Sequence, residues 1–87
     1  MPWYRVLGHM VFIPEQIVEA LESGYAFIIL AVRKKGKEII VTRAVFTNDD
    51  DTVLLPVRKN EMVFTIMTPE EHLAEEIVRV VLEEGVK

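Results

Sequence analysis

The sequence predicts an α+β domain in the order β-α-β-β-β-β-α: an N-terminal strand, a short helix, a four-stranded antiparallel meander and a final helix. Two segments that begin at Pro and end at Gly carry apolar residues at helical spacing. Runs of β-branched and aromatic residues between them are separated by short polar turns, which favours sequential hairpins. Because 87 residues suffice for one domain, we expect a single α+β domain over residues 1–87.

The N-terminal segment WYRVLGHMVFI, residues 3–13, predicts one strand, or two strands broken near Gly8. The next segment, PEQIVEALESG, residues 14–24, predicts a short helix with acidic residues on its outer side. Pro14 suits a first helical turn, and Gly24 suits the left-handed position after a helix.

The meander begins with strands over 25–33 and 37–47, joined by a two-residue turn at Lys35-Gly36. A shorter strand over 52–57 and a last strand over 61–67 complete it. Pro in the third of these strands indicates an edge or a bulge there, since Pro cannot donate to a strand ladder.

The final helix has the clearest signature. Thr68 is placed as its N-cap, Pro69 in its first turn and Glu71 at the capping-box position, while Gly85 ends it. Its expected core-facing stripe consists of Leu73, Ala74, Ile77, Val78 and Val81.

A turn at Lys35-Gly36 makes both faces of the central hairpin apolar, and two short helices are few to cover two faces. We therefore expect a homodimer, joined through a sheet surface or a strand edge. The expected interface residues are Ile28, Leu30, Val41 and Arg43. Arg43 lies mid-strand among apolar neighbours, so it either snorkels at a sheet margin or pairs with a Glu across the interface.

The same turn places Arg33 opposite Glu38 and Lys34 opposite Lys37, the second a destabilising like-charge pair. Successive turns of a meander alternate between its ends, so six of the ten Lys and Arg residues are expected at one end. We call this set the basic end: Arg33, Lys34, Lys35, Lys37, Arg58 and Lys59. The net charge is nevertheless −4, and an acidic turn over 48–51 is expected at the other end.

Clustered cations suggest a small non-enzymatic binding module that docks an anionic partner, with nucleic acid or a ribonucleoprotein as the first candidate. A solvated hairpin tip without a ligand is the plainer interpretation. A protein–protein adaptor is the second function, and a small dimeric enzyme is the third. Such an enzyme would draw on Tyr4, Arg5, His9 and Arg43 near the interface.

The sequence predicts no cofactor and no metal site. Cysteine is absent, the two histidines have no neighbouring ligand in sequence, and Asp49–Asp51 is expected to be a plain turn. No apolar run is long enough for a membrane span, and we expect a cytoplasmic protein without a signal peptide. Abundant Glu with few Asn and Gln suggests a thermophilic source.

Overall fold

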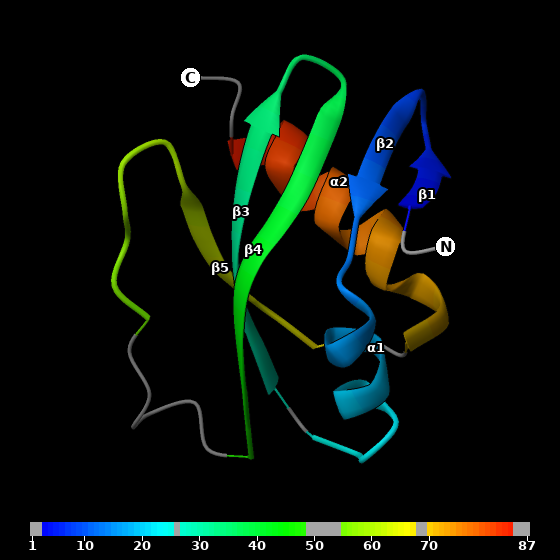
Figure 1. Ribbon diagram of the computed structural model, residues 1–87, viewed down its shortest axis with the longest axis vertical. Coiled ribbons are helices and arrows are strands. Elements are labelled where there is room, and N and C mark those ends of the chain that lie inside the picture. Colours follow the sequence, from blue (N-terminus) through cyan, green and yellow to red (C-terminus); the bar gives the residue numbers. More distant parts are fainter. Residues whose placement is uncertain (1–2, 26, 49–54, 68–69, 85–87) are drawn as a thin grey trace.

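The computed structural model describes residues 3–25, 27–48, 55–67 and 70–84. These residues form one five-stranded sheet with two α-helices, which confirms the α+β class (Figure 1). The elements are β1 (Trp3–Val6), β2 (His9–Phe12), α1 (Glu15–Leu21), β3 (Phe27–Lys35), β4 (Glu38–Thr47), β5 (Met62–Ile66), the 3₁₀ turn η1 (Glu70–His72) and α2 (Leu73–Glu84).

The sheet is mixed, so the predicted antiparallel meander is wrong in its topology. The strand order is β1-β2-β4-β3-β5, with β2 parallel to β4 and all other pairs antiparallel. The strand predicted over 52–57 does not form in its described part, since residues 55–57 lie in no strand. Pro56 there has no N–H to donate to a ladder, and β5 pairs with β3 instead. Strand β3 is therefore central, between β4 and β5.

The N-terminal segment forms the two-strand alternative, a hairpin that turns at Leu7-Gly8. Both turn residues have positive φ, 51° at Leu7 and 78° at Gly8, the combination of a type I′ turn. The side chain of Leu7 is 76% exposed, so no apolar burial offsets its backbone conformation. The hairpin joins the rest of the sheet where Val11 lies opposite Ile39.

The central hairpin turns at Gly36-Lys37, one residue later than predicted. Gly36 has φ 61° in the first turn position, the site that a type II′ turn reserves for glycine. Lys35 therefore lies opposite Glu38 and Lys34 opposite Ile39. The predicted pairs of Arg33 with Glu38 and of Lys34 with Lys37 are both wrong, and the like-charge cost disappears with them.

A bulge at Thr42 changes the faces of β4. Ala31 lies opposite Arg43 while Val32 lies opposite Val41, so Thr42 is the extra residue. Beyond the bulge, every side chain lies on the face opposite to the one that simple alternation predicts. Arg43 therefore leaves the face of Val41, and Ala44 takes its place beside the core.

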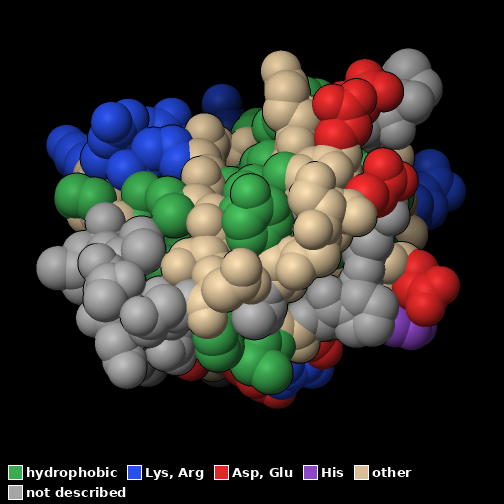
Figure 2. Space-filling model, turned by 90° about the horizontal axis from the view of Figure 1, so that it is seen from below, with side chains coloured by type: hydrophobic (Ala, Val, Ile, Leu, Met, Phe, Trp, Pro, Cys, Tyr) green, Lys and Arg blue, Asp and Glu red, His purple; other side chains and the backbone are tan. Residues whose placement is uncertain are grey.

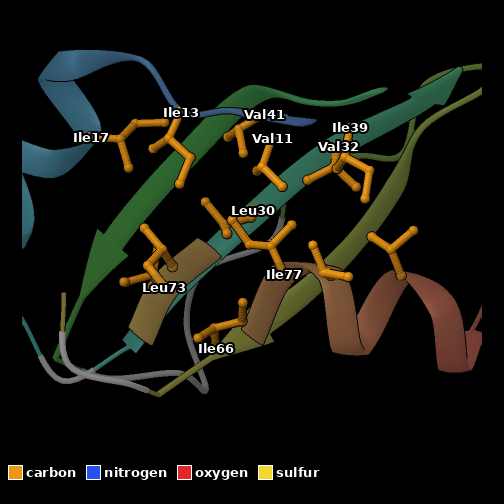
Figure 3. Close-up of a cluster of buried hydrophobic side chains, with 13 residues drawn as sticks. Val11, Ile13, Ile17, Leu30, Val32, Ile39, Val41, Ile66, Leu73 and Ile77 are labelled. Atoms are coloured by element: carbon orange, nitrogen blue, oxygen red, sulfur yellow. The ribbon is translucent and has the colours of Figure 1, made fainter. Parts of the chain in front are cut away.

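The core lies between one face of the sheet and α2 (Figures 1 and 3). Figure 3 shows Val11, Leu30 and Val41 of the sheet directed toward Leu73 and Ile77 of the helix. Each such side chain contributes about 1.5–3 kcal/mol on full burial. The predicted stripe of α2 is confirmed: Leu73, Ile77, Val78 and Val81 are buried, and Ala74 packs against them. Ile17 of α1 closes the same cluster, and Gly24 follows that helix at φ 86°, as expected.

Three of the four predicted interface residues belong to this core. Ile28, Leu30 and Val41 are 2%, 0% and 1% exposed within a single chain. They cannot meet a second copy without displacement of the chain's own helices, so their assignment to an interface is corrected here. The remaining residue, Arg43, lies on the opposite face.

That opposite face of the sheet has no described helix over it (Figure 1). We call it the open face. Its half-exposed apolar side chains are Trp3, Met10, Phe12, Phe27, Ile40, Val45 and Val63. Trp3 and Phe12 pack edge to face, with ring centroids 5.1 Å apart.

Neither of the described α-helices has the length and apolar character needed to cross a membrane.

Candidate functional site

The tip of the β3–β4 hairpin carries four of the six cations of the basic end. Arg33, Lys34, Lys35 and Lys37 are all exposed. The ammonium group of Lys34 donates to the carbonyl of Gly36 over 3.0 Å, which fixes one cation against the turn backbone. Side chains alternate along β3, and that of Val32 faces the core. Arg33 and Lys35 therefore lie on the open face.

The other two cations lie in a tight turn just before β5. The amide of Glu61 donates to the carbonyl of Arg58 over 3.1 Å and closes the turn. Asn60 has φ 66° in its third position, as a type II turn requires. Arg58 and Lys59 precede it and are exposed.

Strand pairing brings the two cationic segments to the same end of the molecule. Met62, the first residue of β5, lies opposite Val32, and the hairpin cations directly follow Val32 along β3. A groove of about 410 Å³ lies between these segments. Its lining consists of Val32, Arg33, Lys34, Lys35, Asn60, Glu61, Met62 and Val81. Arg58 and Lys59 directly precede Asn60 of this lining in the sequence.

Most acidic residues of the described chain belong to α1, η1 and α2, while Glu38 lies opposite Lys35 at the hairpin tip. Figure 2 shows a group of Lys and Arg on one side of the molecule and most of the visible Asp and Glu on the other. On α2, the guanidinium of Arg79 lies 2.6 Å from Glu76 and 3.0 Å from Glu83. Arg79 holds the pKa of Glu76 below its ordinary value. The predicted acidic turn over Asp49–Asp51 lies outside the described residues.

One acidic residue, Glu61, is among those that line the basic groove, and its side chain is only 3% exposed. Its Oε1 accepts from Nη2 of Arg43 over 2.5 Å and from the backbone amide of Arg58 over 3.3 Å. Its Oε2 lies 2.6 Å from the hydroxyl of Thr42, the bulge residue. Hydrogen bonds from Arg43 and then from Thr42 lower the pKa of Glu61 from 4.5 to about 2.

Arg43 pairs inside its own chain, which corrects the prediction of an ion pair across an interface. Its Nη2 also donates to the carbonyl of Pro56 over 2.5 Å. The side chain is 18% exposed, and its Nε is buried without a hydrogen-bond partner among the described residues. The partner that sequence analysis missed is Glu61. A buried arginine requires an acid, but the sequence offers fourteen Asp and Glu residues and no local signal that selects this one.

The structure separates the residues considered for an interfacial enzyme. Tyr4 and Arg5 line a second groove of about 470 Å³ beside α2, together with Leu7 and other residues. His9 is buried, with Nδ1 3.1 Å from the carbonyl of Leu7. Arg43 lies on the open face, where Glu61 engages it. The second histidine, His72, has Nδ1 3.3 Å from Oε1 of Glu75.

Among the described residues, no three His, Asp or Glu side chains gather in a way that could hold a metal ion. Glu61 is joined by hydrogen bonds to Thr42 and Arg43 of β4 and to the backbone of the turn at Arg58. All six cations of the basic end are exposed.

Comparison of the chain with protein-family models, with curated proteins and with solved structures gave no match.

Proposed function

We propose that this protein is a small binding module that docks the phosphate backbone of a nucleic acid through its basic end. The observation that carries the proposal is the groove lined by Arg33, Lys34 and Lys35 from one segment and by Asn60 from another. Lys and Arg at several chain positions around one hollow supply the electrostatic part of nucleic-acid binding.

The chemistry of the groove favours phosphate contact over base recognition. No aromatic side chain appears in its lining. The two described ring pairs, Trp3 with Phe12 and Tyr25 with Phe46, are built from other residues. Stacking of unpaired bases requires exposed aromatic platforms, so we expect binding with little sequence preference.

The net charge of −4 limits the size of the contact. A protein with this charge repels a long polyanion everywhere except at its basic end. We therefore expect a footprint of a few phosphates and an affinity that falls steeply as salt rises.

The direct test is titration of labelled single-stranded RNA and duplex DNA at low and moderate salt. The wild type is compared with a triple variant, Lys34→Glu, Lys35→Glu and Lys37→Glu. We expect salt-dependent binding by the wild type and its loss in the triple variant. If neither polynucleotide binds, or if both proteins bind equally, the proposal is wrong.

A matched pair of single substitutions locates the contact. Lys35→Gln and Arg5→Gln each remove one exposed cation, the first in the groove and the second on β1. Loss of one phosphate contact reduces the salt slope by about one. We expect that reduction for Lys35→Gln and an unchanged slope for Arg5→Gln.

An acidic protein surface is the competing partner for the same cations. A pull-down in which nuclease treatment leaves a bound protein in place, combined with no polynucleotide binding, would favour this second class.

A further inference from the structure

We propose that Arg43 and Glu61 are positioning residues for the basic end: together with Thr42 they hold the turn of Arg58 and Lys59 beside the β3–β4 tip. We call these three residues the clamp. The inference rests on the proposed function, because it assigns the clamp a role in anion docking, but its structural part can be tested separately.

The turn needs an external support. Residues 55–60 belong to no helix or strand, and Arg58, Lys59 and Asn60 are exposed. The contacts described between this segment and the sheet converge on the clamp: the carbonyl of Pro56 accepts from Arg43, and the amide of Arg58 donates to Glu61. Two points on the segment are thereby tied to β4.

The path of the Arg43 side chain depends on the small residue beside it. Arg43, Ala31 and Val63 lie opposite one another across β4, β3 and β5. Glu61 precedes Val63 by two residues, on the same face. To reach it, the guanidinium must cross β3 at Ala31, whose methyl group is 0% exposed. A larger side chain at this point would occupy that path.

The bulge completes the clamp. Because Thr42 is the extra residue of β4, its hydroxyl and the guanidinium of Arg43 both reach the Glu61 carboxylate, although consecutive strand residues normally point to opposite faces. The hydroxyl also lies 3.1 Å from the carbonyl of Ala31, and its single proton serves one acceptor at a time.

Electrostatics and positioning give opposite expectations for Glu61. As an anion in a cationic groove, it should weaken the binding of phosphate, so its removal should tighten binding. As the holder of the turn, its removal should release Arg58 and Lys59 and weaken binding. This difference in sign separates the two roles.

The test compares Glu61→Gln with Glu76→Gln, which removes the same charge from a surface ion pair on α2. Each protein is titrated with labelled single-stranded RNA over a salt series. For Glu61→Gln we expect weaker binding and a salt slope lower by up to about two, one for each released cation. For Glu76→Gln we expect an unchanged slope. Equal or tighter binding by Glu61→Gln at an unchanged slope would overturn the proposal.

Amide hydrogen exchange without RNA tests the clamp independently of docking. We expect faster exchange at Arg58 and Glu61 in Glu61→Gln, with amides of the buried β3 residues unchanged. Thr42→Val removes one hydrogen bond and no charge, so it should change the salt slope and the amide exchange in the same direction by a smaller amount. This variant replaces Glu61→Gln in both measurements if Glu61→Gln does not fold.

The outcomes separate the two proposals. If the wild type binds no RNA, docking fails, and unchanged exchange would then also overturn the clamp. If the wild type binds RNA but Glu61→Gln matches it in slope and exchange, only the clamp fails.

Discussion

At the scale of single residues, five described positions have a positive φ, and four of them hold Gly or Asn, which tolerate it. Gly36 has φ 61° and Asn60 has φ 66°. Leu7, with φ 51°, is the exception, because the left-handed region costs a residue with a branched side chain about 1 kcal/mol or more. Its side chain is 76% exposed and recovers nothing through burial.

We therefore expect Leu7→Asn to stabilise the protein by about 1 kcal/mol, since Asn-Gly is the preferred pair for this turn. The measurement is urea unfolding at neutral pH. Leu7→Ala is the control: it removes the same exposed apolar surface but keeps a poorly tolerated Cβ. An Asn variant no more stable than the Ala variant would show that the turn carries no such strain.

Residue-level prediction succeeded where the chemistry is local. The left-handed glycine after α1 follows from the preference of glycine for positive φ. The need of Arg43 for an acid also follows from its apolar neighbours, but the choice of Glu61 does not. That choice depends on how far β5 lies from β4, which is a property of the folded sheet.

At the scale of elements, hairpins were easier to predict than their registers. The β3–β4 hairpin was expected, yet a turn at Gly36-Lys37 in place of Lys35-Gly36 changes every pair. Both turns contain a two-residue loop with Gly, and sequence pattern alone does not choose between them. The bulge at Thr42 also has no signature in the sequence. Both faces of the hairpin are apolar, so the pattern of apolar residues does not show where β4 changes faces.

The contact of Glu61 joins two elements, and its pKa makes that contact dependent on pH. The folded pKa of about 2 lies below the ordinary 4.5, so ionisation favours the folded state. This contribution is complete above pH 4.5 and is lost as pH falls toward 2. We expect Glu61→Gln to be less stable than the wild type at pH 7, with a gap that narrows between pH 4.5 and 2.

Guanidinium unfolding of both proteins across that pH range measures the gap. Comparison with the wild type at each pH cancels the titration of the other carboxyl groups. Glu19→Gln, which changes an exposed carboxyl on α1, should show a small gap at every pH. A gap for Glu61→Gln that is the same at pH 7 and pH 2.5 would contradict the assignment.

At the scale of the whole molecule, one sheet face is covered by helices, and the open face has no described helix over it. The sequence predicts that both sheet faces are apolar and that two short helices are too few to cover both. The helices cover the face to which the interface residues Ile28, Leu30 and Val41 were assigned. Sequence cannot order strands that pair across long separations, so the neighbour of β3 and the covered face were not predictable.

The homodimer stays a prediction, now placed on the open face. Half-exposed Trp3, Phe12, Ile40 and Val45 there would be buried by a second copy. We expect sedimentation equilibrium at micromolar concentration to show twice the 10.0 kDa of one chain. Ile40→Lys should shift the mass to one chain, while Leu7→Lys, at the exposed β1–β2 turn, should not. A wild type that sediments as a single chain would remove the dimer.

The bulge has a consequence for the gene that encodes this chain. Loss of the single codon for residue 42 would leave the composition almost intact, yet it would bring Arg43 to the core face and turn Ala44 and Phe46 away from it. Substitutions can accumulate one at a time in β4, but a length change there would alter every later position of the strand at once. Between Glu38 and Thr47 we therefore expect lineages to differ in residue type and to agree in length.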